Sequence, residues 1–430
     1  MPRTRVCSAA LLALATLATV SACSVSEPSA SAGGKNGQEI TFLTFETPNL
    51  PPAYWDAAIK RITARYPDIK VKKLVSPSAD RTAYAKQLRA SGQFPDVMIA
   101  VSPSGFAEAG DLYAWQPSEL KDFVVPDGGA IDGKVYQLPT NTQTIPNVYY
   151  RKSMFAAAGI TAPPKTYDEL LADCAKLKAK GTTPFVVGGG KDAFPSVLPL
   201  TGTVATDVYR TDPDWMVKRR AGKVGFDQPD FVGALSKLGT LARKGYIDPK
   251  MISLDYAATE QAFLKGKGAM YPMGSWFASA GDKSAIKDDI GVFRWPTGDG
   301  SELLSEYTGG GLDVNAHSKN LDAAKKFALA FQLDRKNLDA NVRSDAVFPA
   351  IKGYTPPKDM GPVFNETYDL WTKAQKDKKT VKAFAWETGG DGLLPGMDAK
   401  VFAATQDVVL GRKSPKEAAS YLDEEWKKAS

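Results

Sequence analysis

Few residues of this 430-residue chain could support catalysis by a familiar scheme. His317 is the single histidine, which argues against Ser-His-Asp and Cys-His catalysis and against His-rich metal sites. It precedes a polar stretch at an expected helix start, and a position in a surface loop is its simpler interpretation. The three cysteines, Cys7, Cys23 and Cys174, include no Cys-x-x-Cys pair, so neither a zinc site nor a redox motif is indicated.

Carboxylates remain as candidates, because a glycosidase uses two of them and needs no histidine. The chain has two acidic clusters, Asp288-Asp289 and Asp423–Glu425. Adjacent residues diverge around a helix or strand, so both clusters are interpreted as solvated surface. The run Gly188–Lys191 matches neither a P-loop nor the dinucleotide-binding fingerprint. We therefore expect no catalytic residue, no cofactor and no metal site, and an exported glycosidase is the competing interpretation.

The sequence that leads to Trp276 predicts where this residue lies on its sheet. A short helix over Leu254–Lys265 is stopped by Gly266, since glycine adopts the left-handed conformation without a Cβ clash. A strand at Gly268–Tyr271 and a tight turn at Gly274-Ser275 then place Trp276 just past the carboxyl end of the strand. Ligands bind at that edge of open α/β sheets. From this residue alone, a tryptophan of the hydrophobic core is the favoured interpretation, and a ligand-binding residue is the alternative.

The N-terminus has the features of an export signal. A basic start precedes an apolar run, Val6–Val20, which is too short to span a membrane but suits a secretory signal. Small residues before Cys23 resemble the lipobox of bacterial lipoproteins, which implies a signal peptide of residues 1–22 and lipidation of Cys23. An ordinary signal with a chance cysteine is the alternative. Residues 23–38 are rich in Ser, Ala and Gly and are expected to form a flexible tether.

Composition bounds the remaining function classes. Lys and Arg number 54 and Asp and Glu 48, and the formal net charge of +6 is too small for this length to predict nucleic-acid binding. The length allows two domains of ordinary size. No stretch beyond the N-terminal one approaches a transmembrane span.

Strands and helices alternate in the first part of the chain. Strands are predicted at Glu39–Phe45, Asp68–Val75 and Pro95–Val101. The helices between them are opened by Pro51-Pro52 in the first case and end near Gly92 in the second. This order predicts a mostly parallel sheet that is covered on both faces.

A second α/β group follows. A capping box at Thr166–Glu169 starts a helix that carries Cys174, whose spacing from neighbouring leucines predicts burial. Strands are predicted at Pro184–Val187 and Ile290–Arg294. The last helix begins at a second capping box, Ser414–Glu417.

Several phrases, in a fixed order, resemble the extracellular solute-binding proteins (family 1) of sugar ABC importers. They are RYPDIKV at 65–71, FPDV at 94–97, DGKVYQLP at 132–139, AGITAPPKTYDELL at 158–171, and GKGAM followed by GSW at 266–276. The resemblance covers nearly all of the chain after the tether. It implies an α/β, two-lobed periplasmic-binding-protein fold of type II, in which chain crossovers form a hinge. The implied lobe 1 comprises 39–141 plus 310–347, and lobe 2 comprises 145–305 plus 350–430.

Three crossovers are implied by the same resemblance. The first passes through Thr140–Thr144, a polar segment between two extended runs that suits a hinge connector. The second is Leu304–Val314, where Gly309-Gly310-Gly311 could allow backbone rotation or the close approach of a ligand; a plain loop is the alternative. The third is Ala346–Ile351. The remaining residues are expected to pack on the second lobe as helices.

The implied function is capture of a sugar or oligosaccharide between the lobes and its delivery to the permease subunits of an ABC transporter. The expected location is the extracellular face of the cytoplasmic membrane, with a lipid anchor, as a monomer that binds no nucleic acid. Another polar solute, such as a polyol or a glycerol phosphodiester, stays open within the fold. Neither the sugar nor its length follows from the sequence.

The residues expected to bind the ligand are carried over at matching positions. Trp276 is the platform on which a sugar ring stacks, and Trp386 aligns loosely with a second aromatic residue. Asn141 and Gln143 lie in the first crossover, where an amide donates to and accepts from vicinal hydroxyls. The other expected contacts are Glu46 after the first strand, Ser102 after the third strand, and the backbone of Gly310. These segments hold no cluster of Arg or Lys, which suits an uncharged solute.

Overall fold

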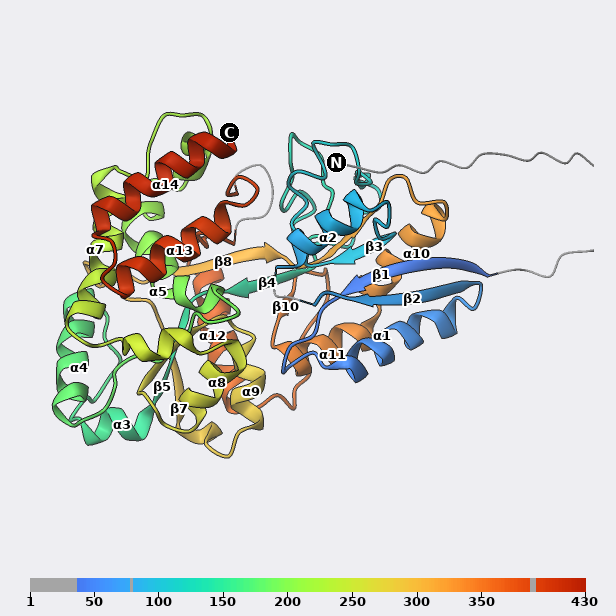
Figure 1. Ribbon diagram of the computed structural model, residues 1–430. Coiled ribbons are helices and arrows are strands. Elements are labelled where there is room, and N and C mark those ends of the chain that lie inside the picture. The colour runs from blue at the N-terminus through green and yellow to red at the C-terminus, as the bar shows by residue number, and fades with distance from the viewer. Residues whose placement is uncertain (1–36, 78–79, 387–391) are drawn as a thin grey trace, which may run out of the picture. The chain divides into compact units, whose positions relative to one another are not determined.

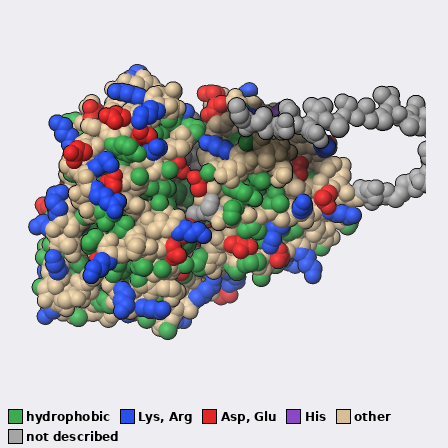
Figure 2. Space-filling model, viewed as in Figure 1, with side chains coloured by type: hydrophobic (Ala, Val, Ile, Leu, Met, Phe, Trp, Pro, Cys, Tyr) green, Lys and Arg blue, Asp and Glu red, His purple; other side chains and the backbone are tan. Residues whose placement is uncertain are grey.

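The computed structural model describes residues 37–77, 80–386 and 392–430 (Figure 1). The expected signal peptide 1–22, Cys23 and the tether up to residue 36 lie outside the described residues. Within those ranges no helix is both long and apolar enough to cross a lipid bilayer. Figure 2 shows Lys and Arg side chains interspersed with Asp and Glu over the face in view.

The first lobe is built on a four-stranded sheet of order β2-β1-β3-β9. Strand β1 pairs in parallel with β2 and β3, and β9 runs antiparallel to β3. The predicted strand-helix alternation and the mostly parallel sheet are therefore confirmed. The elements are β1 (Gln38–Thr44), α1 (Pro52–Arg65), β2 (Ile69–Val75), α2 (Arg81–Ala90), β3 (Val97–Ile99), β9 (Leu312–Val314) and α10 (Leu321–Leu333).

Both faces of this sheet are covered because the strand residues alternate in direction. Phe42 of β1 packs against Trp55 of α1 and Phe327 of α10, with ring centroids 6.2 and 5.3 Å away. On the other face, Leu43 packs in a cluster with Leu88 of α2.

The second lobe contains a three-stranded sheet of order β6-β5-β7 and most of the helices. Strand β5 is antiparallel to both neighbours. The strands are β5 (Asn147–Arg151), β6 (Met270–Met273) and β7 (Ile290–Arg294). The helices are α3 (Lys152–Ala157), α4 (Tyr167–Ala179), α5 (Leu198–Val204), α6 (Trp215–Arg220), α7 (Pro229–Arg243), α8 (Tyr256–Leu264), α9 (Phe277–Lys283), α12 (Pro362–Lys376), α13 (Met397–Val409) and α14 (Pro415–Ala429). Short helical turns are η1 (Phe194–Val197), η2 (Ala205–Tyr209), η3 (Pro249–Ser253) and η4 (Lys287–Asp289).

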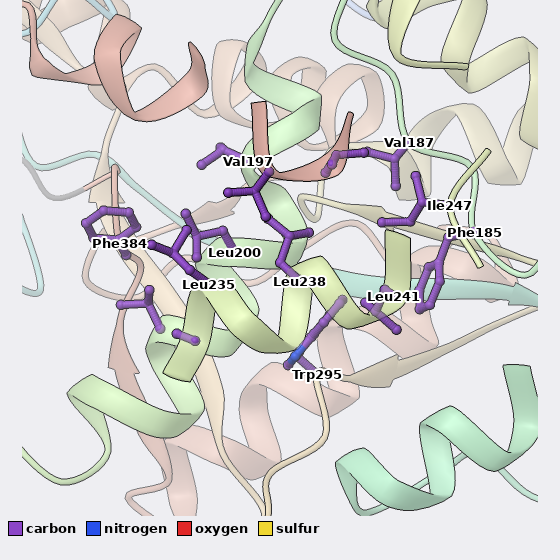
Figure 3. Close-up of a cluster of buried hydrophobic side chains, with 14 of the residues drawn as sticks. Phe185, Val187, Val197, Leu200, Leu235, Leu238, Leu241, Ile247, Trp295 and Phe384 are labelled. Atoms are coloured by element: carbon purple, nitrogen blue, oxygen red, sulfur yellow. The ribbon is translucent and has the colours of Figure 1, made fainter. Parts of the chain in front are cut away.

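The core of this lobe is apolar and aromatic. Leu235, Leu238 and Leu241 of α7 point into it together with Phe185 and Phe384 (Figure 3). Cys174 belongs to the same cluster and is fully buried, as its spacing predicted. Burial raises the pKa of the Cys174 thiol, so this residue behaves as a small apolar side chain.

One prediction in the second lobe was wrong, and another was correct only in part. The segment Pro184–Val187 is extended and donates from Val186 N to Met270 O at 2.8 Å, but it forms only isolated bridges through Phe185 rather than a strand. The acidic clusters were predicted to be solvated, and Asp288 and Glu424 are indeed exposed, but at least one carboxylate of each cluster is half-buried. Asp289 pairs with Arg151 at 2.6 Å and Asp423 pairs with Arg219 at 2.8 Å, so both carboxylates are held in ion pairs.

A third sheet, of order β10-β4-β8-β11, joins the lobes. Its strands β4 and β8 run between the two halves of Figure 1. It consists of β4 (Asn141–Thr144), β8 (Leu304–Gly309), β10 (Phe348–Pro349) and β11 (Thr380–Lys382). The three expected crossovers are present, but two details were wrong: the polar segment Thr140–Thr144 contributes a strand rather than a connector, and the C-terminal part adds β11 to its helices.

Glycine is required where the chain leaves this hinge sheet. Gly310 has φ +71° between β8 and β9, which only glycine adopts without strain. A Cβ on Gly311 would lie 1.8 Å from the carbonyl oxygen of Leu138. The second crossover is therefore more than a plain loop.

Helix ends follow the predicted capping. Both capping boxes are present, from Thr166 to Glu169 and from Ser414 to Glu417. One helix that the sequence did not indicate, α11 (Arg335–Asp345), packs against both α10 and α9 and so contacts both lobes. His317 lies exposed in a turn, as expected.

Candidate ligand-binding site

A cavity of about 950 Å³ lies between the lobes and is lined by residues of both, and by the hinge strands β4 and β8. All seven residues predicted for ligand binding line it: Glu46, Ser102, Asn141, Gln143, Trp276, Gly310 and Trp386. The fold thus brings together residues that are separated by up to 340 positions in the sequence. Their contact with a ligand stays a prediction.

Trp276 reaches this cavity from the end of β6, at the residue before α9. Its indole lies directly over Gly274, because a Cβ there would come within 2.0 Å of Trp276 Cζ3. Only glycine leaves room for the ring in this position. Ser275 N donates to Thr144 O of β4 at 2.9 Å, which ties the turn to the hinge sheet. Trp276 is half-buried rather than sealed in the core.

Trp386 belongs to the same aromatic wall. Phe194 of η1 lies between the two tryptophans, with ring centroids 6.4 Å from Trp276 and 6.4 Å from Trp386. Tyr256 of α8 packs on Phe194 at 5.3 Å. The sequence did not predict a role for Phe194, because no motif or periodic pattern marks it.

The two hinge amides are buried in the cavity wall. Asn141 donates from Nδ2 to Asn341 Oδ1 at 3.2 Å, while its own Oδ1 has no hydrogen-bond partner within the described residues. Gln143 accepts from the hydroxyl of Tyr307 on β8. Burial raises the pKa of Tyr307, which keeps this hydroxyl protonated. Asn141 therefore retains an acceptor, whereas the Gln143 carbonyl already has a donor.

The other predicted contacts lie where the cavity opens. Glu46 and Ser102 are exposed. The Ser102 N–H donates to Thr82 Oγ1 at 3.0 Å, which fixes the backbone after β3.

Most of the charged residues of the cavity were not predicted from the sequence. Its carboxylates are Glu46, Asp80, Asp192, Asp255, Asp345 and Asp398, and its basic side chains are Arg81, Lys86 and Lys191. The segments named from the sequence hold no cluster of Arg or Lys, but α2 and the loop before η1 supply basic side chains to the cavity. Carboxylates nevertheless outnumber them two to one, which disfavours an anionic solute.

Asn49 and Asp345 form a polar contact next to the Trp276 turn. Asn49 Nδ2 donates to the backbone oxygen of Trp276 at 2.9 Å and to Asp345 Oδ1 at 3.2 Å. Burial raises the pKa of Asp345 to about 7, against the opposing effects of Asn49, Arg81 and Lys283. No sequence motif marked either residue.

Aromatic faces next to amides and carboxylates suit a polar ring compound, which stacks on one surface and forms hydrogen bonds at its edge. No group of three or more His, Cys, Asp or Glu side chains arranged to hold a metal ion occurs among the residues that the structure describes.

Comparison with known proteins shows which sequences resemble this chain. The profile of the bacterial extracellular solute-binding proteins matches residues 47–332. The multiple sugar-binding protein of Streptococcus mutans is 27% identical over 339 residues, which cover 71% of this chain and 74% of that protein. A probable sugar-binding periplasmic protein of Mesorhizobium japonicum is 26% identical and is aligned over 64% of each chain.

Solved structures give the same fold. A chitin oligosaccharide binding protein superposes with a TM-score of 0.79 and 25% identity, over 92% of this chain and 99% of that one. The maltose-bound MalE3 of T. maritima gives a TM-score of 0.71 and 20% identity, over 91% and 99%. The architecture is the two-lobed periplasmic-binding-protein fold of type II, and the chain belongs to the bacterial extracellular solute-binding protein family.

Proposed function

We propose that this protein is the substrate-binding component of an ABC importer that captures a sugar or oligosaccharide in the cavity between its lobes. The observation that carries the proposal is the position of Trp276, whose indole reaches the cavity and is accommodated by Gly274. Relatives named for sugar binding, and the chitin oligosaccharide binding protein of the same fold, support the ligand class.

The physical basis of capture is closure of the two lobes about the hinge sheet. Closure removes water from a ligand that is stacked on Trp276, and it strengthens each hydrogen bond from the cavity wall. The closed form is the one that the permease would recognise. The lobes implied by the sequence, 39–141 plus 310–347 and 145–305 plus 350–430, are part of this proposal, as are the seven predicted contact residues.

Anchoring and export are proposed from the N-terminal sequence alone. Cleavage after residue 22 would leave Cys23 to be lipidated, and the segment that follows would hold the protein at the extracellular face of the cytoplasmic membrane. We propose a monomer that binds its sugar without breaking a bond.

Thermal unfolding against a sugar panel tests the proposal. Malto-, chito- and xylo-oligosaccharides and raffinose are suitable members, with a polyol and a glycerol phosphodiester as alternatives. A ligand at a hundredfold above its dissociation constant adds about 2.7 kcal/mol to the apparent stability. A shift with intact sugar recovered supports binding; a new product in the mixture supports a glycosidase instead.

Trp276→Ala should remove most of that shift while the melting temperature without sugar stays nearly constant. The matched control is Trp371→Ala. Trp371 is also half-buried but does not line the cavity, and it donates to Glu306 Oε2 at 2.7 Å. This control should melt earlier without sugar yet keep its sugar-induced shift. A large loss of stability in Trp276→Ala without sugar would contradict the platform role.

A further inference from the structure

Three segments that are distant in the sequence meet at a single amide. Asn49, in the connection from β1 to α1, is only 5% exposed. Its Nδ2 donates to the backbone oxygen of Trp276 in the second lobe and to the carboxylate of Asp345 at the end of α11. Both N–H groups of that nitrogen are used, so the two acceptors lie within about 6 Å of each other.

Asp345 is fixed in this position by its own helix. Ser279 Oγ of α9 donates to the Arg343 backbone oxygen at 3.0 Å, which joins the last turn of α11 to the helix that starts after Trp276. The chain then leaves the helix through Ala346 in the left-handed conformation, with φ +43°. The Asp345 carboxylate is therefore placed relative to the Trp276 platform by both a hydrogen bond and helix packing.

The Asp345 carboxylate still has capacity for a ligand. It lines the cavity, and among the described residues it accepts a hydrogen bond from Asn49 alone. A carboxylate has about four acceptor sites, so the half-buried Asp345 oxygens can accept further hydrogen bonds. Hydroxyl groups of a ring stacked on Trp276 are donors of the required kind.

On the basis of the proposed function, we propose that Asp345 is a specificity-determining residue, which accepts hydrogen bonds from ring hydroxyls of the sugar. Asn49 is the positioning residue that joins Asp345 to the Trp276 platform. A sugar that lacks the hydroxyl would leave acceptor sites of this half-buried carboxylate unfilled, and hydrogen bonding to such a group discriminates between ligands.

Ionisation gives this assignment a measurable signature. The groups that act electrostatically on Asp345, or on which it acts, lie on each element packed around it: Tyr54 on α1, Arg81 on α2, Tyr256 and Glu260 on α8, Lys283 on α9 and Tyr307 on β8. Burial raises the pKa of Asp345 to about 7, although Asn49, Arg81 and Lys283 act in the opposite direction. Hydroxyl donors favour the ionised form, so sugar binding should strengthen as the pH rises through 7 and should release a proton.

Isothermal titration of the full chain tests the assignment, with the panel sugar that gives the largest thermal shift. Wild type should bind at least tenfold more tightly at pH 8.5 than at pH 5.5. At pH 7 the binding enthalpy should depend on the ionisation enthalpy of the buffer, as proton release requires. Asp345→Asn should weaken binding at least tenfold at pH 8.5 and remove the pH dependence.

The positioning role of Asn49 is tested by removing its amide and by exchanging the side chains of positions 49 and 345. Asn49→Ala should weaken binding, and the double variant Asn49→Asp with Asp345→Asn should not restore it, because a carboxylate at position 49 repels the Trp276 carbonyl. Asp339→Asn is the matched control: Asp339 lies on the same helix but pairs with Arg335 and Tyr354. It should keep the wild-type affinity and pH profile.

The outcomes separate this inference from the proposed function. Wild-type binding that is independent of pH, or an Asp345→Asn variant within twofold of wild type, overturns the role of Asp345 and leaves sugar binding intact. Failure of wild type to bind any sugar overturns both. The wild-type pH and buffer dependence need no variant, so they decide the matter even if a substitution prevents folding.

Discussion

Replacing Glu260 by Gln should stabilise the unliganded protein at high pH and have little such effect at low pH. Glu260 lies on α8 and is 3% exposed, and its Oε2 has no hydrogen-bond partner among the residues described. Burial, reinforced by Asp345, raises the pKa of Glu260 to about 7, whereas Tyr256 and Lys283 act in the opposite direction. Glutamine keeps the shape of the side chain and cannot ionise.

The sign and size of this change in stability follow from the difference in proton binding between the folded and the unfolded chain. Below pH 4.5 Glu260 is protonated in both the folded and the unfolded chain. Between pH 4.5 and 7 the unfolded chain loses its proton while the folded chain keeps it, so stability falls as the pH rises. Each pKa unit is worth about 1.4 kcal/mol, so the change from 4.5 to about 7 corresponds to about 3 kcal/mol at pH 8. The coupling to Asp345 makes this an upper figure for the single substitution.

Urea unfolding of wild type and Glu260→Gln between pH 5 and 8.5 measures the effect. The difference in free energy of unfolding should move in favour of the variant, by up to about 3 kcal/mol across this range. Glu302→Gln is the control, because Lys373 and Arg294 lower the pKa of Glu302 to about 2 and its carboxylate is ionised throughout. Its difference from wild type should stay constant above pH 5.5. Parallel curves for wild type and Glu260→Gln would contradict a raised pKa for Glu260 in the folded chain.

Two further substitutions separate the site from the scaffold. Gly274→Ala should displace the Trp276 indole, because the new methyl group would lie 2.0 Å from Cζ3, and titration should show sugar affinity at least tenfold weaker; unchanged affinity would show that the ring position is not needed. Thr166→Ala removes the cap on the Glu169 N–H at 3.1 Å and should cost about 1 kcal/mol in urea unfolding. Its sugar-induced thermal shift should match wild type, and a lost shift would contradict the separation of this helix from the cavity.

Local elements were the most predictable part of the fold. The strand Ile290–Arg294 has the bounds that the sequence predicted. Both capping boxes also form, because a cap depends only on residues three positions apart. The lobe sequence was predictable from the resemblance, since several phrases occur in a fixed order along the chain.

The hinge was harder to predict because its strands depend on distant partners. Thr140–Thr144 has no apolar pattern, yet β4 pairs with β8 and β10, which follow it by more than 150 residues. For Pro184–Val187 the error is the reverse, because a strand was predicted and none forms. Its apolar run suits a strand, but it gains only isolated bridges to its neighbours.

The solute-binding family and the tryptophan at the edge of β6 were predictable from the sequence alone, because both depend on short phrases in a fixed order. Two features became visible only in the folded chain: Phe194 joins Trp276 to Trp386 in one aromatic wall, and Asn49 links Asp345 to the Trp276 turn. The physical reason is that an amide between the lobes, or a carboxylate whose pKa depends on its burial, gains its properties from neighbours hundreds of residues away. Local sequence does not contain that information.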